Sequence, residues 1–165
     1  KLIIAGTYTG QILIYDIRAG PSPILKSPNT GKYHSLPIYS INNFGMQNSN
    51  QIVSCSNDGL ICTFNISNLS KALKKIEIKK SVENKFSQAV TMEEIGVISS
   101  ANRIDSEYLY VGSDDSDLYQ IFLGQADQNE TIYEPYKKHI GPVTSLSLHP
   151  GDYHKNIDVS YINFI

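Results

Sequence analysis

The amino-acid sequence predicts an all-β fold built from a repeated hairpin. Apolar residues alternate with a period of two along most of the 165 residues, and the only helix-like stretch is a short piece at 69–75. Three segments align without gaps: TYTGQILIYDI (7–17), SNDGLICTFNI (56–66) and SDDSDLYQIFL (113–123). Self-similarity of this kind is typical of repeat architectures.

Each aligned segment begins with a turn that joins two apolar strands. The strands before the turns are LIIAG, QIVSCS and YLYVGS. Asp58-Gly59 and Thr9-Gly10 supply residues that tolerate the positive φ of a tight turn. After each turn come an inward apolar residue and then a larger one, in the pairs Ile12 and Tyr15, Ile61 and Phe64, Leu118 and Ile121.

A second element also repeats, since HSLPIYSI (34–41) and HIGPVTSL (139–146) align with their His and Pro in register. The hairpins recur about every 50 residues, somewhat more than the roughly 40 to 45 of a four-stranded propeller blade. The excess leaves room for longer loops. We therefore expect an inner strand, two middle strands and an outer strand in each blade.

The expected blades take their strands from consecutive segments. The first complete blade would use 37–44, 51–56, 60–66 and 74–80, and the next would use 89–95, 107–113, 117–123 and about 131–136. A four-stranded sheet that is apolar on both faces is stable only when neighbouring sheets cover it. The sequence thus predicts a partial β-propeller over 1–165: blade parts 1–30, blade 31–80, blade 81–137 and a blade start at 138–165. We expect a fragment with two complete blades plus parts of two others.

Composition argues against several functional classes. Fourteen basic and sixteen acidic residues give a net charge of −2, which provides no general attraction for nucleic acid or an anionic membrane. No apolar run approaches the roughly 18 residues of a membrane span, and the start has no signal-peptide pattern. The sequence therefore predicts an intracellular protein. Cys55 and Cys62 are expected to face each other across a hairpin, either as buried apolar residues or as a redox pair.

One blade carries a set of residues that resembles the WD-repeat signature. The set comprises His34 before the inner strand, Ser54 or Ser56 on the next strand, Asp58 and Gly59 in the turn, and Phe64. In that family such residues form a structural hydrogen-bonded relay. His139 and Pro142 begin another copy. The chain departs from the family because it has no Trp, so blade stability should depend more on apolar packing.

The same side chains match a Ser-His-Asp triad in composition only. No GxSxG elbow accompanies them, so we expect no catalytic residue and no enzyme activity. The histidines at 34, 139, 149 and 154 lack partners at ligand spacing, and GSDDSD (112–117) lacks the central Gly and the terminal Glu of a calcium loop. No metal or cofactor is expected. The basic stretch at 71–80 indicates an outer edge strand whose lysines discourage edge-to-edge pairing with another sheet. The alternative is a binding site for an acidic protein or a phosphate partner.

Longer stretches resemble the propeller of the cytoplasmic dynein intermediate chain family. The resemblance is clear over residues 2–70 and looser beyond them. It depends on the Gly-Thr-Tyr-x-Gly-Gln run at 6–11, Pro37-x-Tyr39, the Gly-x-Gln-Asn at 45–48, Asp58, Gly59, Cys62 and Leu69-Ser70.

This resemblance implies a non-catalytic scaffold subunit of the cytoplasmic dynein microtubule motor, whose propeller docks on the tail of the dynein heavy chain. It implies a cytoplasmic, cytoskeleton-associated protein. The family's amino-terminal segment, which recruits light chains and dynactin, has no counterpart in these residues. The alternatives are a WD-repeat scaffold of another complex, such as an axonemal dynein or a ubiquitin-ligase adaptor, and a propeller enzyme. The loops that bind the partner are not predicted.

Overall fold

The computed structural model describes residues 1–44, 50–83, 90–103, 106–124, 135–137, 139–148 and 160–161. Every regular element in these ranges is a β-strand, which confirms the predicted all-β fold. The strands are β1 (Leu2–Gly6), β2 (Ile12–Asp16), β3 (Leu25–Lys26), β4 (Ile38–Phe44), β5 (Gln51–Ser56), β6 (Leu60–Asn65), β7 (Lys74–Glu77), β8 (Lys79–Glu83), β9 (Val90–Glu94), β10 (Val97–Asn102), β11 (Tyr108–Ser113), β12 (Asp117–Phe122), β13 (Tyr136–Lys137), β14 (Ser147–Leu148) and β15 (Ser160–Tyr161).

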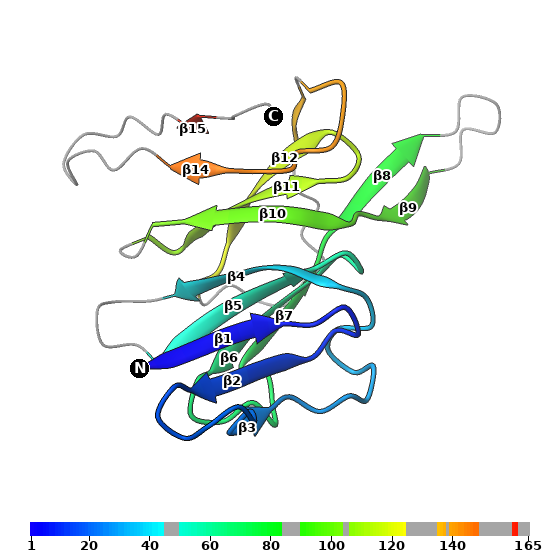
Figure 1. Cartoon of the computed structure of the whole chain (residues 1–165). Helices are drawn as coiled ribbons and strands as arrows, with labels where there is room; N and C mark the ends of the chain where they lie inside the picture. Colours follow the sequence, from blue (N-terminus) through cyan, green and yellow to red (C-terminus); the bar gives the residue numbers. More distant parts are fainter. Residues whose placement is uncertain are drawn as a thin grey trace.

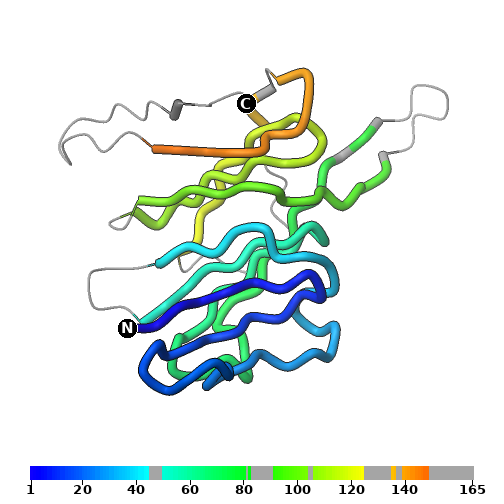
Figure 2. The backbone as a smooth tube through the Cα atoms, viewed as in Figure 1, coloured from blue at the N-terminus to red at the C-terminus, as the bar shows by residue number. Residues whose placement is uncertain are grey.

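Three antiparallel sheets follow one another along the chain and in space (Figures 1 and 2). The first sheet is β1-β2-β3, the second is β4-β5-β6-β7 and the third is β10-β11-β12-β13. In each sheet, consecutive strands are neighbours, so each is a meander of the kind that forms a propeller blade. The architecture is that of a partial β-propeller.

The second sheet is buried on both faces because it lies between the other two. Val53, Cys55 and Ile61 pack in a core shared with the third sheet. Ile52 and Phe64, which alternate with them, pack in a core shared with Ile12 and Ile14 of the first sheet. This explains why β5 and β6 are buried at nearly every position instead of every second one.

Polar side chains also join the second and third sheets, along their inner strands. The Asn42 amide donates to Ser100 Oγ at 2.7 Å, and Ser100 Oγ donates to Ser40 Oγ at 2.8 Å. Near the end of the same strands, Asn102 Nδ2 donates to the Asn43 carbonyl at 2.7 Å. These contacts fix the two inner strands against each other.

The three aligned hairpin turns share one backbone geometry. Gly10, Gly59 and Ser116 occupy the same aligned position and have φ values of 78°, 73° and 76°. At Gly59 the turn also touches the next sheet, because a Cβ there would lie 2.8 Å from the Ile95 carbonyl oxygen. Glycine is therefore required at this position for both backbone and packing reasons.

The predicted inner strand of the third sheet, 89–95, is wrong. Residues 90–94 form β9, which pairs with β8 in a separate hairpin, and β10 is the inner strand. Thr91 through Glu94 are all exposed, whereas an inner strand must bury one face, as Val97 and Ser99 do. The predicted outer strand at 74–80 is divided between two sheets: residues 74–77 form β7, Ile78 is fully buried, and residues 79–80 belong to β8.

The expectation that Cys55 and Cys62 face each other is also wrong. Cys55 pairs with Ile61, and Cys62 pairs with Ser54, so the register places the two cysteines on opposite faces of the sheet. They belong to different cores. In the helix-like stretch at 69–75, residues 69–73 form a loop and residues 74–75 begin β7. His149, His154 and most of the predicted strand at 131–136 lie outside the described residues.

Candidate functional site

The structure brings His34, Ser54 and Asp58 together at the end of the second sheet. His34 lies in the segment that leads into β4, Ser54 lies on β5, and Asp58 lies in the β5–β6 turn. His34 Nε2 is 2.7 Å from Ser54 Oγ, and His34 Nδ1 is 3.6 Å from Asp58 Oδ1. All three side chains are buried.

The hydrogen bonds of this cluster join separate segments of the chain. Ser54 Oγ donates to the Cys62 carbonyl at 3.2 Å and lies 2.7 Å from His34 Nε2, where donor and acceptor depend on the tautomer of the ring. The cluster thus joins β5 both to β6 and to the segment that leads into β4.

Asp58 holds the turn and the segment before β4 in place. Its Oδ2 accepts the Ser35 N–H at 2.7 Å, and its Oδ1 accepts the Leu60 N–H at 3.1 Å. Burial alone would raise the pKa of Asp58, but the adjoining His34 ring and these two N–H groups hold it well below its usual range. Ser56, the alternative relay serine, donates instead to the Leu36 carbonyl at 2.9 Å.

Phe64 packs without extending the relay. Its ring is fully buried and meets the Tyr33 ring edge-on, with 5.3 Å between centroids and 82° between planes. Where the WD-repeat pattern has an indole N–H, this blade has only apolar contact. Such aromatic pairs contribute about 0.5–1.5 kcal/mol beyond burial.

The third sheet uses a different polar cluster at the equivalent end. Lys80 Nζ is 2.8 Å from both Asp115 Oδ2 and Asp117 Oδ2, and the Tyr119 hydroxyl donates to Asp115 Oδ2 at 3.2 Å. Hydrogen bonds to the two carboxylates raise the pKa of Lys80. Burial, reinforced by the nearby carboxylates, raises the pKa of Tyr119. Ser113, the counterpart of Ser56, accepts the Asp117 N–H at 3.2 Å, and its single proton is shared between two nearby acceptors, the Asp117 carbonyl and Asp115 Oδ1.

Sequence reasoning missed this cluster because it read the basic stretch as an edge guard. In the structure, Lys80 reaches across to the third sheet, and Lys74 Nζ donates to the Leu123 and Gly124 carbonyls of that sheet. These two lysines therefore join neighbouring sheets. The only pattern in the sequence of this stretch is that Ile76 and Ile78 alternate with charged residues. This pattern does not distinguish a free edge strand from a covered one.

His139 and Pro142 lead toward the last strands as His34 and Pro37 lead into β4. The Val143 N–H donates to the Ser113 carbonyl at 3.0 Å, and Ser99 Oγ donates to the Val143 carbonyl at 2.6 Å. In the same way, the Ile38 N–H donates to Thr7 of the first sheet at 3.2 Å. Each lead-in segment thus docks on the hairpin of the sheet before it.

The described residues hold no group of three His, Cys, Asp or Glu side chains arranged as metal ligands. Burial raises the pKa values of the Cys55 and Cys62 thiols to about 12, so both are protonated at neutral pH. Over the same ranges, no helix has the length and hydropathy needed to cross a bilayer.

Sequence comparison identifies relatives among dynein subunits. The chain is 31% identical over 150 residues to the cytoplasmic dynein 1 intermediate chain of Drosophila melanogaster, covering 90% of this chain and 21% of that protein. It is 27% identical over 151 residues to the ciliary dynein intermediate chain 3 of Heliocidaris crassispina, covering 90% of this chain and 24% of that protein. The chain spans less than a quarter of either relative. No protein-family model matches it. The comparisons confirm the resemblance to dynein intermediate chains.

Proposed function

We propose that this chain, which is related to dynein intermediate chains over nine tenths of its length, is part of an intermediate-chain propeller that serves as a non-catalytic scaffold in a dynein motor. Its proposed partner is the dynein heavy chain, and its proposed setting is the cytoskeleton. The observation that carries the proposal is the 31% identity that extends across 90% of the chain, from the first sheet into the third.

The chemistry of the clusters supports a scaffold role. Serine, aspartate and lysine side chains can take part in catalysis in other proteins, but here they join turns, strands and neighbouring sheets. Ser54 donates to a backbone carbonyl, Asp58 accepts backbone N–H groups, and both thiols are buried. A rigid stack with loop-lined ends is suited to binding a large protein surface.

The blade assignment accompanies this proposal. Blade parts at 1–30, a blade at 31–80, a blade at 81–137 and a blade start at 138–165 would form part of one propeller. The second and third sheets supply the two four-stranded units. Within 81–137, the four-stranded sheet itself begins at Val97.

Cytoplasmic dynein is the first candidate and an axonemal dynein is the second. The higher identity is to the cytoplasmic intermediate chain, but the ciliary one matches an equal share of this chain at 27% identity. Both candidates share a docking role on a heavy chain. They differ in which heavy chain is bound.

The test is affinity purification of the tagged full-length protein, with the partners identified by mass spectrometry. We expect a cytoplasmic dynein heavy chain to co-purify in near-stoichiometric amount. Recovery of an axonemal heavy chain alone would favour the second candidate. Recovery of a ubiquitin-ligase core without any dynein heavy chain would refute the proposal.

A further inference from the structure

The β8–β9 hairpin projects from the body of the molecule between the second and third sheets (Figures 1 and 2). We call residues 79–83 and 90–94 the arm. The corresponding link between the first and second sheets, residues 27–37, contains no strand. Stacking of one sheet on the next therefore does not require the arm, and its presence calls for another explanation.

The base of the arm is firmly fixed. Ile78 and Ile95, which flank it, are buried in the core between the second and third sheets. The Ile78 N–H donates to the Gly59 carbonyl at 2.9 Å, and Lys80 binds the carboxylates of Asp115 and Asp117. The arm thus leaves the body in a defined direction.

Both edges of the arm are open. β8 pairs with β9, and neither strand has a second neighbour among the described residues. Thr91 through Glu94 are exposed on both faces of β9. An open edge presents unpaired N–H and C=O groups, and a two-stranded hairpin is marginally stable in water until a further strand or a packed face supports it.

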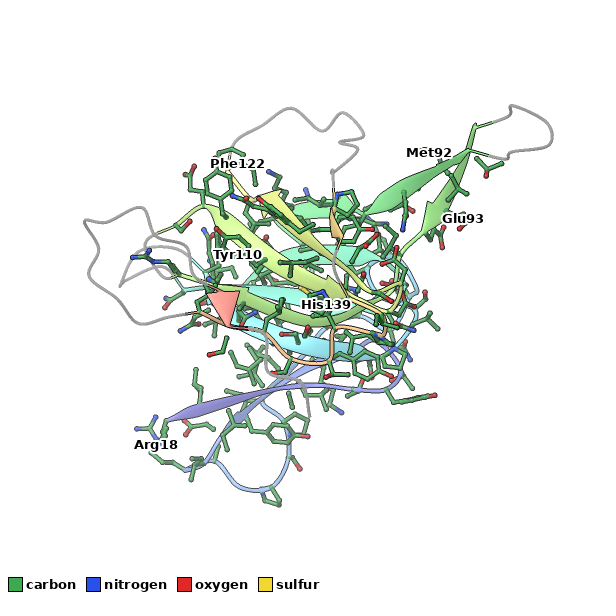
Figure 3. The ribbon with its side chains drawn as sticks, turned by 90° about the horizontal axis from the view of Figure 1, so that it is seen from above. Arg18, Met92, Glu93, Tyr110, Phe122 and His139 are labelled. Atoms are coloured by element: carbon green, nitrogen blue, oxygen red, sulfur yellow. The ribbon has the colours of Figure 1, made fainter. Side chains whose placement is uncertain are left out.

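The arm also carries two glutamates without ionic partners. The ladder places Glu93 opposite Lys80 and Glu94 opposite Lys79. However, the Lys80 ammonium is bound to the third sheet, and Lys79 Nζ lies 3.3 Å from Glu77. Neither Glu93 nor Glu94 has an ion pair in the described part of the chain. Figure 3 shows Met92 and Glu93 out on the arm, away from the sheets.

We propose that the free edge of β9 accepts an extended, Lys- or Arg-bearing segment of a partner polypeptide as a third strand. The backbone ladder would supply affinity, as in other cases of strand addition. Glu93 and Glu94 point to opposite faces of the strand, so they favour basic side chains on both faces of the incoming segment. Met92, 41% exposed, offers an apolar contact between them. This inference needs only the fold and is independent of the proposed dynein role.

The experiment measures binding of a fluorescein-labelled, ten-residue peptide to the full-length protein, by anisotropy at low salt. In this peptide, pairs of lysines alternate with pairs of threonines, so that lysines lie on both faces of the extended strand. The companion probes are the same peptide with alternate backbone nitrogens methylated and a glutamate-threonine peptide. The test variant is Glu93→Lys with Glu94→Lys. The control is Glu107→Lys, another exposed acidic residue on a different part of the molecule.

The lysine peptide is expected to bind the unmodified protein and the control variant equally, and the double variant about tenfold more weakly. Methylation of the peptide backbone should weaken binding to the unmodified protein by at least the same factor, and the glutamate peptide should not bind. Hydrogen exchange of the amides of 91–94 should slow when the lysine peptide is bound. Absence of binding, equal binding to the double variant, or equal binding of the methylated peptide would each overturn the inference. An unchanged melting temperature in the double variant shows that a loss of binding does not reflect unfolding.

Discussion

At the scale of single residues, the buried side chains of Asp58, Ser54 and Ser56 bind backbone groups. Asp58 accepts two backbone N–H groups, and Ser54 and Ser56 donate to backbone carbonyls. The relay residues were identifiable from their spacing, because a His, a Ser and an Asp recur in register with a hairpin. The backbone partners of these side chains were not, because they depend on which carbonyl and N–H groups the fold places beside them.

Replacing Asp58 with Ala should destabilise the fold and leave partner binding unchanged. The substitution leaves the N–H groups of Ser35 and Leu60 without their acceptor, which costs on the order of 1–3 kcal/mol. Urea unfolding of the full-length protein measures the loss. Glu94→Ala, at an exposed glutamate without an ion pair, is the control and should change stability little. Loss of heavy-chain binding at an unchanged unfolding midpoint would contradict this role.

The acid limb of the stability profile should also depend on Asp58. Its pKa is lower in the folded protein than in the unfolded chain, so its contribution is complete above the unfolded value of about 3.9 and is lost as the pH falls below it. Asp58→Asn should therefore flatten the decline in unfolding free energy between about pH 5 and pH 2. A decline as steep as in the unmodified protein would show that other carboxylates dominate.

Substitutions at the aligned turn position occupied by Ser116 and Gly59 should change the stability of the fold in opposite directions. Ser116 holds a φ of 76°, which is unfavourable for a residue with a Cβ, so Ser116→Gly should stabilise the fold by about 0.5–1 kcal/mol. The reverse substitution, Gly59→Ser, should destabilise it by more than that, because the new Cβ would also meet the Ile95 carbonyl. Thermal unfolding compares the two. Destabilisation by both would mean that the turns do not share one geometry.

At the scale of elements, the strands that follow the repeat were predictable and the segment between sheets was not. The strands β4, β5, β6, β11 and β12 lie close to their expected bounds, because turn residues and apolar runs mark them. The apolar residues of 89–95 alternate weakly, and this pattern alone predicts an inner strand. Only the tertiary structure shows that Thr91 through Glu94 are all exposed and that Val97 begins the buried strand.

Lys80 should be more important for stability than its neighbour Lys79. Lys80→Met leaves the carboxylates of Asp115 and Asp117 beside each other without their shared cation, which should cost about 1–2 kcal/mol. Lys79→Met removes one exposed pair with Glu77 and should cost less than about 0.5 kcal/mol. Chemical denaturation measures both variants, and a double-mutant cycle with Asp117→Asn isolates the coupling. Equal costs for the two lysines would show that Lys80 does not join the sheets.

At the scale of the whole molecule, the stacking of similar sheets accounts for the chain's composition. Strands that carry apolar side chains on both faces must be covered on both sides. The second sheet is covered by its two neighbours. The stacking was predictable from the repeat and this apolar content. Which side chains cross between sheets was not predictable, because Ser40, Asn42, Ser100 and Lys74 read as ordinary surface residues until the sheets are placed side by side.

The central claim is that consecutive repeats form sheets that lie face to face in chain order, and a single cysteine substitution tests it. Cys55 Sγ on the second sheet lies 3.5 Å from Ser100 Oγ on the third, whereas Cys62 belongs to the opposite core. In folded, full-length protein carrying Ser100→Cys, mild oxidation followed by peptide mapping should reveal a disulfide between Cys55 and the introduced thiol, and Cys55→Ser should abolish it. A disulfide from the introduced thiol to Cys62 instead of Cys55 would contradict the stacked arrangement.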